Sequence, residues 1–284
     1  MELDKKTLVD NLDGEYVVVN GTKIRYIVKG NGSPVLLIHG FGQFLEVWWF
    51  NIGPLSQHYQ VYAMDLPGYG LSDKPGIDYT LSSATEFIID FMEALGIEHA
   101  SLIGHSMGGI ICLGGAINFP SKVDRIILVD SGSLFEKVPL LYRLCALPIL
   151  GDILVRPTIK AGVRRRIKRA FYNPDLVTED MVNLNYELLK IPGVKDTMLG
   201  VLRNGVRRSG SNPETIVTDK LHLVKVPTLL IHGAQDTVIP LEYTQNACRL
   251  IPDCRLEIID ECGHCPHLEK ASEFNKAVIS FLGG

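Results

Sequence analysis

Short runs of apolar and β-branched residues recur along the chain and predict the strands of a sheet. They cover residues 15–20, 23–28, 35–39, 61–65, 100–105, 125–130, 228–233 and 255–260. From the third run onward the apolar residues are continuous, which is typical of strands that are buried on both faces. The first two runs meet at Asn20-Gly21, which supplies the positive φ angles of a two-residue hairpin turn.

Helical patterns lie between the later strands. They cover residues 44–57, 80–96, 106–118, 240–250 and 268–282. Thr80 is expected to cap the second of these helices, because its hydroxyl can accept a hydrogen bond from a first-turn N–H. Strands that alternate with helices indicate a mostly parallel α/β sheet, here with an antiparallel start.

The alternation stops between 134 and 220, where the pattern is helical and no strand is predicted. This segment has 15 Lys and Arg against 9 Asp and Glu, whereas the rest of the chain has 13 against 23. Two parts of opposite charge suggest a separate layer. We therefore expect one core α/β domain formed by residues 1–133 and 221–284, and a helical cap or lid formed by residues 134–220.

Composition and charge exclude several classes of protein. The hydrophobic fraction of 46% and the charged fraction of 21% are typical of a globular chain and unlike disordered or coiled-coil sequences. The net charge is −4 and no basic stripe runs along the chain, so we expect no nucleic-acid partner. The polar, acidic start lacks the basic and apolar regions of a signal peptide, which predicts a cytoplasmic location.

The cysteines and one uncharged stretch bear on the compartment and on a possible membrane span. The six cysteines lie in apolar or strand-like segments, which predicts reduced, buried thiols rather than disulfides. Residues 99–121 carry no Asp, Glu, Lys or Arg and are numerous enough to span a bilayer. Five glycines and a polar turn in mid-segment instead favour a buried strand followed by a helix.

A Gly-x-Ser-x-Gly pattern at 104–108 follows that strand and opens the helix. This is the pattern of a nucleophile elbow, in which glycines allow a sharp, strained turn and the serine is exposed at its tip. Ser106 would then lie at a helix N-terminus, where N–H groups and the helix dipole favour developing negative charge. Ser106 is therefore the predicted nucleophile.

A serine hydroxyl needs a base that takes its proton. His264 and His267 follow the last predicted strand, and ligand crevices form at the carboxyl ends of parallel strands. His264, next to Gly263, is the predicted base, whereas His267 adjoins the final helix and is expected either to cap that helix or to contact the catalytic residues from behind. His39, at the end of an earlier strand, is expected to orient its loop.

The base in turn needs a carboxylate that fixes its tautomer. Asp236, directly after the strand at 228–233, is the predicted acid, and Asp130 at the end of another strand is the alternative. Asp65 and Asp73 flank a turn and are expected to bond to its backbone.

The oxyanion of a tetrahedral intermediate needs N–H donors, each of which lowers the barrier by roughly 3 to 4 kcal/mol. Phe41, in the loop His39-Gly40-Phe41-Gly42, is predicted to supply one backbone N–H and Met107 the other. Cys262-Gly-His-Cys265 resembles a metal motif, but zinc needs four ligands and no second pair has this spacing. We expect no metal and no cofactor.

The motifs HGFG, DLPGYGLSD, GHSMGG, GAQDTVIP and GHCPHLE occur in this order, and together they resemble the α/β-hydrolase fold superfamily. The resemblance covers nearly the whole chain apart from the 134–220 segment, which corresponds to the variable cap. It implies an eight-stranded sheet, a Ser106/Asp236/His264 triad and an oxyanion hole formed by Phe41 and Met107.

The resemblance also bears on the reaction. Haloalkane dehalogenases and epoxide hydrolases use an Asp nucleophile, so Ser106 argues against both. Hydrolases of meta-cleavage products, which break carbon–carbon bonds, have a similar cap and triad but usually a more glycine-rich oxyanion loop and a Trp after the catalytic His. This chain has Gly-Phe-Gly and Cys265 at those places. Ester hydrolysis of the carboxylesterase or lipase type is therefore the main prediction, with carbon–carbon hydrolysis or a non-enzymatic ligand receptor as alternatives.

The cap predicts an apolar pocket and a small ester or acyl substrate with a hydrophobic part. Trp48 and Trp49 are expected either to wall this pocket or to pack in the core. An apolar run at 138–155 precedes seven Lys and Arg between 156 and 169. This run predicts a lid with a solvated basic face, and a weak contact with an anionic membrane surface is the alternative. The sequence leaves the oligomeric state open.

Overall fold

The computed structural model describes residues 13–132, 140–155, 159–207, 210–212 and 217–283. Eight strands form one sheet: β1 (Glu15–Val19), β2 (Thr22–Lys29), β3 (Pro34–Ile38), β4 (Gln60–Met64), β5 (Ala100–His105), β6 (Val123–Val129), β9 (Thr228–Gly233) and β10 (Cys254–Ile259). Their spatial order is β1-β2-β4-β3-β5-β6-β9-β10. The β1–β2 and β2–β4 pairs are antiparallel and the other pairs are parallel. The α/β-hydrolase fold class predicted from the sequence is confirmed.

The hairpin and the helix cap show why these elements form where they do. Asn20 and Gly21 have φ angles of 49° and 77°, as a tight hairpin turn requires. Helix α3 (Leu81–Ala94) begins after Thr80, whose hydroxyl accepts a hydrogen bond from Ser83 N at 3.1 Å. Both features agree with the sequence prediction.

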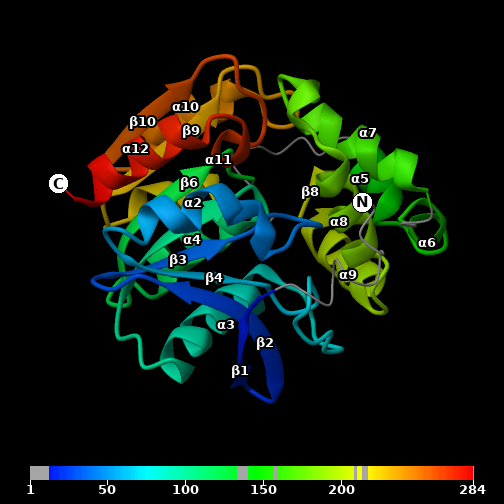
Figure 1. The fold of residues 1–284 in the computed structure, drawn as a ribbon, viewed down its shortest axis with the longest axis horizontal. Helices are drawn as coiled ribbons and strands as arrows, with labels where there is room; N and C mark the ends of the chain where they lie inside the picture. The colour runs from blue at the N-terminus through cyan, green and yellow to red at the C-terminus, as the bar shows by residue number, and fades with distance from the viewer. Residues whose placement is uncertain (1–12, 133–139, 156–158, 208–209, 213–216, 284) are drawn as a thin grey trace.

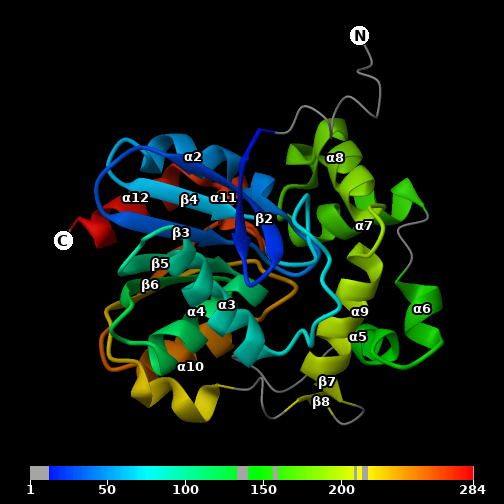
Figure 2. The same ribbon diagram turned by 90° about the horizontal axis from the view of Figure 1, so that it is seen from below.

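Helices cover both faces of the sheet, as Figures 1 and 2 show. The 3-10 turn η1 (Leu45–Trp48), α2 (Trp49–Leu55), α11 (Pro266–Glu269) and α12 (Ala271–Leu282) cover one face, and α3, α4 (Met107–Asn118) and α10 (Leu241–Leu250) cover the other. Each face has its own apolar core, one around Trp48 and Phe274 and the other around Phe91 and Leu102. Burial on both faces explains the continuous apolar runs of the central strands.

Short helices connect β6 to β9. They are α5 (Leu140–Cys145), α6 (Leu150–Leu154), α7 (Lys160–Ala170), η2 (Pro174–Leu176), α8 (Glu179–Leu189), α9 (Val194–Gly205) and η4 (Thr218–Leu223). Figures 1 and 2 place α5 to α9 beside one end of the sheet. The prediction that this segment has no strand was wrong, since β7 (Val206–Arg207) and β8 (Gly210–Ser211) form a two-residue antiparallel pair. The predicted boundary at 133/134 lies outside the described residues.

The basic run of this segment contributes most of α7. Arg164 pairs with Glu179 of α8 at 2.6 Å, and Lys160 approaches the same carboxylate at 3.9 Å. These pairs tie α7 to α8 at the molecular surface. Contact of the run with an anionic membrane stays a prediction.

The uncharged residues 99–121 form β5, the serine turn and α4. Among the described residues, no helix combines the length and the apolarity that crossing a bilayer would require.

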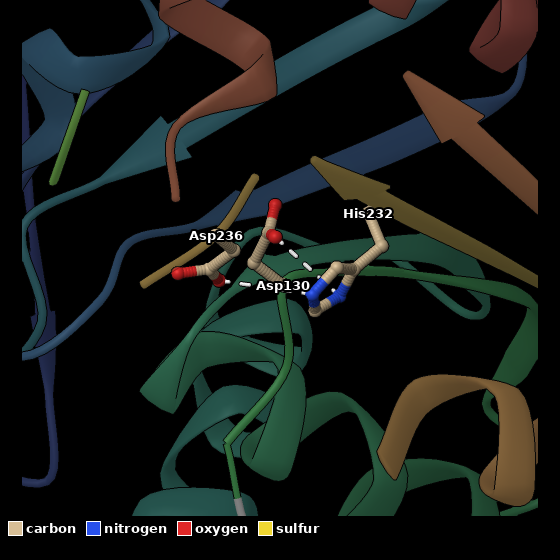
Figure 3. A group of neighbouring side chains, drawn as sticks. All are labelled: Asp130, His232 and Asp236. Carbon is tan, nitrogen blue, oxygen red and sulfur yellow. Dashed lines mark ion pairs between the residues drawn. The ribbon is translucent and has the colours of Figure 1, made fainter. Parts of the chain in front are cut away.

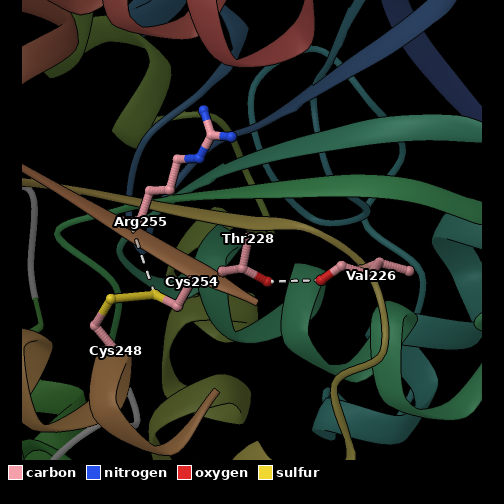
Figure 4. Close-up of a disulfide and its surroundings, with 5 residues drawn as sticks. All are labelled: Val226, Thr228, Cys248, Cys254 and Arg255. Carbon is pink, nitrogen blue, oxygen red and sulfur yellow. Dashed lines mark hydrogen bonds between the residues drawn. A yellow bond between two sulfur atoms is a disulfide. The ribbon is translucent and has the colours of Figure 1, made fainter. Parts of the chain in front are cut away.

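One cysteine prediction was wrong. Cys248, in the last turn of α10, and Cys254, at the start of β10, form a disulfide with their Cα atoms 5.4 Å apart (Figure 4). The tight connection between α10 and β10 turns the chain back on itself and brings the two thiols together. The other four cysteines, at 112, 145, 262 and 265, are free and buried as expected.

Candidate active site

Ser106 lies at the turn between β5 and α4 in a strained backbone conformation. Its φ of 52° and ψ of −112° fall where few residues other than glycine are found. A side chain at Gly104 would collide with the carbonyl of Gly108, and one at Gly108 would collide with the carbonyl of Ile38. The two glycines therefore let the start of α4 pack directly against the end of β3, as the elbow pattern predicts.

Asp236 and His264 are brought together, although 28 positions separate them. His264 Nδ1 donates a hydrogen bond to Asp236 Oδ2 at 2.7 Å, which leaves Nε2 without its proton and able to act as a base. Asp236 Oδ1 accepts from the backbone N–H groups of Val238 and Ile239 at 2.6 and 3.1 Å. Burial opposes ionisation of Asp236, but the hydrogen bond and the charge interaction with His264 hold its pKa below the ordinary value.

The loop of His264 is fixed beside Ser106 by contacts that sequence reasoning missed. His105, the residue before the serine, donates from Nε2 to the carbonyl oxygen of His264 at 2.7 Å, and the two rings lie 4.8 Å apart. The backbone N–H of His264 donates to the carbonyl of Ala170, at the end of α7, across 2.7 Å. The position of His105 within the serine motif was the one signal for its role. A hydrogen bond between Ser106 Oγ and His264 Nε2 is not among the bonds of the described residues, and such bonds often tighten only when substrate binds.

The predicted oxyanion loop lies next to the serine turn. The side-chain oxygen of Gln43 accepts the Gly40 N–H at 2.8 Å and lies 2.9 Å from His105 Nδ1, so the loop and the elbow are in direct contact. Met107 is the first residue of α4, and first-turn N–H groups have no acceptor within the helix. Phe41 and Met107 both line the same cavity. This arrangement suits two N–H donors directed at a developing oxyanion.

His39 and Asp65 hold the surrounding loops. His39 donates from Nδ1 to the Gly40 carbonyl and accepts the Leu66 N–H on Nε2, at 2.9 and 3.0 Å. Asp65 accepts hydrogen bonds from the backbone N–H groups of Leu45 and Leu71. These residues therefore support the loops, as the sequence indicated.

The two tryptophans and His267 lie away from the cavity wall. Trp48 is fully buried with its ring 4.6 Å from that of His267, whereas Trp49 is 59% exposed. The ring of His267 also lies 4.5 Å from that of His105 at an interplanar angle of 48°, and neither of its ring nitrogens has a hydrogen-bond partner within the described chain. Burial lowers the pKa of His267 to about 3, so the ring is neutral. His267 therefore does not cap the last helices, and the other expectation holds, since its ring packs against that of His105 behind the proposed base.

A cavity of about 270 Å³ opens onto Ser106. Its wall is mainly apolar, and none of the described residues that line it carries a charge. The polar lining groups are Tyr69, Tyr79, Thr80, Ser83, Ser106 and Tyr142. Tyr142 of α5 and Leu202 of α9 contribute to the wall, so the segment between β6 and β9 closes one side of the cavity.

Arg166 of α7 reaches the oxyanion loop from this segment. Its Nη2 donates to the Gly42 carbonyl at 3.3 Å, while the side chain stays accessible to solvent. Arg166 has no ion pair with the described part of the chain, unlike Arg164. Sequence reasoning treated the whole basic run alike and missed this residue.

Asp130, the alternative acid, does not bond to His264. It follows β6, is completely buried, and lies with Asp236 and His232 in one group whose polar atoms are within 4.8 Å of one another (Figure 3). His232 Nε2 donates to the Ile239 carbonyl and Nδ1 bonds the Thr244 hydroxyl, at 3.0 and 2.9 Å. Because both ring nitrogens are already occupied, this group does not suit a metal ion.

The sheet order, the serine turn after β5 and the histidine loop after β10 define an α/β hydrolase. The family profile described as "Alpha/beta hydrolase family" matches residues 35–277. The 2-hydroxy-6-oxo-6-(2'-aminophenyl)hexa-2,4-dienoic acid hydrolase of Metapseudomonas resinovorans is 31% identical over 274 residues, covering 94% of this chain and 90% of that protein. The chain therefore belongs to the alpha/beta hydrolase family.

Solved structures agree with this assignment. A mutant meta-cleavage product hydrolase from Pseudomonas fluorescens IP01 superposes with a TM-score of 0.81 at 27% identity, over 95% of this chain and 97% of that one. A membrane phospholipase A superposes with a TM-score of 0.81 at 25% identity, over 99% of this chain and 88% of that one.

Proposed function

We propose that this protein is a serine hydrolase that cleaves the carbon–carbon bond next to the ketone of a 2-hydroxy-6-oxo-2,4-dienoic acid. The observation that carries the hydrolase chemistry is the Asp236–His264 hydrogen bond beside the strained Ser106, at the wall of an apolar cavity. The proposed bond type is supported by the relatives, which include a 2-hydroxy-6-oxo-2,4-dienoic acid hydrolase at 31% identity and a meta-cleavage product hydrolase at 27% identity. They favour this reaction over the ester hydrolysis that the sequence placed first.

In the proposed reaction Ser106 attacks the C6 ketone while His264 Nε2 takes its proton. The tetrahedral oxyanion is held by the N–H groups of Phe41 and Met107. Its collapse breaks the C5–C6 bond, and His264 returns the proton to the departing fragment. His264 then activates a water molecule that releases the acyl group from Ser106. Asp236 keeps His264 in the required tautomer throughout.

A carbon leaving group must be able to accommodate the electron pair of the broken bond. In the tautomer with a ketone at C2, the pair left on C5 is conjugated through the C3–C4 double bond to that ketone and forms a dienolate. The same serine chemistry that opens an ester can therefore open this carbon–carbon bond.

The two ends of such a substrate differ in polarity, and the site offers a place for each. The uncharged cavity suits an apolar group on C6. Arg166 does not line the cavity, but it reaches Gly42 of the oxyanion loop and has no ion pair within the described chain, so we assign it the carboxylate at the edge of the site. The α5–α9 segment supplies both Arg166 and part of the cavity wall, and we assign it the role of a cap.

The test is consumption of 2-hydroxy-6-oxo-6-(2'-aminophenyl)hexa-2,4-dienoic acid, followed by loss of its dienolate absorbance. Mass spectrometry should show 2-aminobenzoate and 2-hydroxypenta-2,4-dienoate as products. Ser106→Ala should abolish turnover while the variant keeps the melting temperature of a folded protein. Saturable binding without turnover, on this acid and on esters alike, would instead favour a ligand receptor.

Ester hydrolysis is the second candidate. Cys265 follows the base where meta-cleavage hydrolases usually have Trp, and a phospholipase A is among the structural neighbours. A p-nitrophenyl ester series of increasing acyl length tests this reading. A higher kcat/KM for an ester than for the dienoic acid would make an ester the better substrate class.

A further inference from the structure

Two carboxyl groups meet inside the protein behind His264. Asp130 follows β6 and Asp236 follows β9, and these strands are neighbours in the sheet. In Figure 3 both carboxyl groups are directed toward the imidazole of His232. Asp130 Oδ1 lies 3.4 Å from His232 Nδ1, and Asp236 Oδ2 lies 3.8 Å from His232 Nε2.

The backbone commits Asp130 to this position. Its φ of 41° is in the left-handed region, which aspartate and asparagine adopt more readily than most residues. Its backbone N–H donates to the Ile231 carbonyl at 3.0 Å, and Oδ1 accepts the Gly233 N–H at 3.2 Å. Asp130 is therefore fixed to β9 through both its main-chain N–H and its carboxyl group.

His232 supplies no proton to Asp130. A carbonyl oxygen only accepts, so the bond to Ile239 places the ring proton on Nε2. Nδ1 is then an acceptor and receives the Thr244 hydroxyl proton. Burial lowers the pKa of His232, which keeps the ring neutral.

Asp236 is the member of the pair that carries the charge. It already accepts three N–H groups, from His264, Val238 and Ile239. Asp130 has a single N–H donor on Oδ1, and its buried Oδ2 has no partner within the described chain. Two carboxylates buried this close together cannot both ionise cheaply. Burial, and then the charge of Asp236, raise the pKa of Asp130 well above its ordinary value.

We propose that Asp130 is a positioning residue whose protonated Oδ2 donates a hydrogen bond to the Asp236 carboxylate and so holds that carboxylate toward His264. This inference rests on the roles proposed for Asp236 and His264. The donated bond also reduces the negative charge that Asp236 presents to the base, and so lowers the affinity of the base for a proton.

Other titratable groups surround the pair and are the same in every variant compared. Glu269 of α11 faces it, as do the thiols of Cys262 and Cys265, while His232 and His264 adjoin the carboxyl groups directly. The Asp130 variants change only Asp130, so a shift in their pH profile reports on its own proton.

The test measures the rate at which a fluorophosphonate reacts with Ser106 from pH 5 to pH 9, which needs no natural substrate. Asp130→Asn keeps the shape, tolerates the positive φ and offers an N–H donor in place of the O–H. It should react within about threefold of the wild-type rate. Asp130→Ala lacks the donor and should react about tenfold more slowly. In the Asp130→Ala variant the acid limb of the pH–rate profile should move to higher pH, because Asp236 then attracts the proton of His264 more strongly.

An ionised Asp130 would shift the pH–rate profiles in the opposite direction. If Asp130 were ionised, both variants would remove a negative charge and both acid limbs would move to lower pH. Asp130→Ala with wild-type rates at every pH would also overturn the proposal. Should Asp130→Ala fail to fold, Asp130→Gly, which has no Cβ to strain at this φ, takes its place.

Asp236→Asn separates this inference from the proposed function. If Asp236→Asn loses reactivity with the fluorophosphonate while Asp130→Ala reacts like the wild type, only the proposed role of Asp130 is refuted. Wild-type reactivity in Asp236→Asn would remove the proposed triad itself.

Discussion

His105 Nε2 donates a hydrogen bond across 2.7 Å to the main-chain carbonyl of His264. The residue that precedes the proposed nucleophile thus fixes the backbone of the proposed base. His105→Phe keeps an aromatic ring but removes this donor, and we expect kcat to fall about tenfold with little change in KM. His267→Phe is the matched control, because the ring of His267 packs 4.5 Å from that of His105 and makes no hydrogen bond within the described chain. An equal loss of kcat in both variants would point to the ring packing rather than to the bond.

The backbone strain at Ser106 should appear as a cost in stability. Ser106→Gly relieves a φ of 52° and a ψ of −112°, and we expect it to raise the free energy of unfolding by about 1 kcal/mol. Ser106→Ala keeps the strain and should bring no comparable gain. Urea denaturation of the three proteins measures the difference. A glycine variant less stable than wild type would contradict the idea that strain is stored at this turn.

The neutral, buried His267 should make stability depend on pH. Its pKa is lowered to about 3 in the folded protein, against 6.5 for an ordinary histidine, so the unfolded chain binds the extra proton. The stability contribution is complete above pH 6.5 and is lost as the pH falls toward 3. Between pH 6.5 and pH 5 it amounts to about 2 kcal/mol. His267→Phe should therefore show a smaller loss of unfolding free energy over this interval, and identical losses would argue against a neutral His267.

Arg166 should distinguish acidic from neutral substrates. Arg166→Ala should raise KM for the dienoic acid about tenfold to a hundredfold, since it removes a charge-assisted pair. KM for a p-nitrophenyl ester should not change. Arg165→Ala, on the neighbouring exposed residue of α7, is the control and should leave both constants as they are. If the ester KM rose equally, Arg166 would be acting through the Gly42 loop rather than through a carboxylate.

The disulfide between Cys248 and Cys254 should stabilise the α10–β10 connection. Closing so short a loop is worth about 2 kcal/mol in the unfolded-state entropy model. Reduction with dithiothreitol should lower the melting temperature of the wild type but not that of Cys248→Ser. Activity should persist after reduction, because neither cysteine lines the cavity.

The sequence predicted the parts of the molecule that local patterns determine. Continuous apolar runs indicated the buried strands, and the glycines around Ser106 indicated the turn, because each is a requirement of the backbone itself. The contact of His264 with Ala170 could not be read in this way, since it joins segments 94 residues apart through main-chain atoms that any side chain could carry. The proton on Asp130 was equally hidden, because it follows from the distance to Asp236 and from burial.

Hydrogen bonds join the end of α7 and the residues after it to the loop that carries His264. Ala170 accepts the His264 N–H, and Tyr172 N donates to Glu269, whose other oxygen accepts the Gly263 N–H. A hinge that swung this end of the helix outward would pull the base away from the nucleophile. The geometry of the proposed triad therefore depends on residues 170–172 as well as on the three side chains themselves, because these residues hold the loop that carries the base.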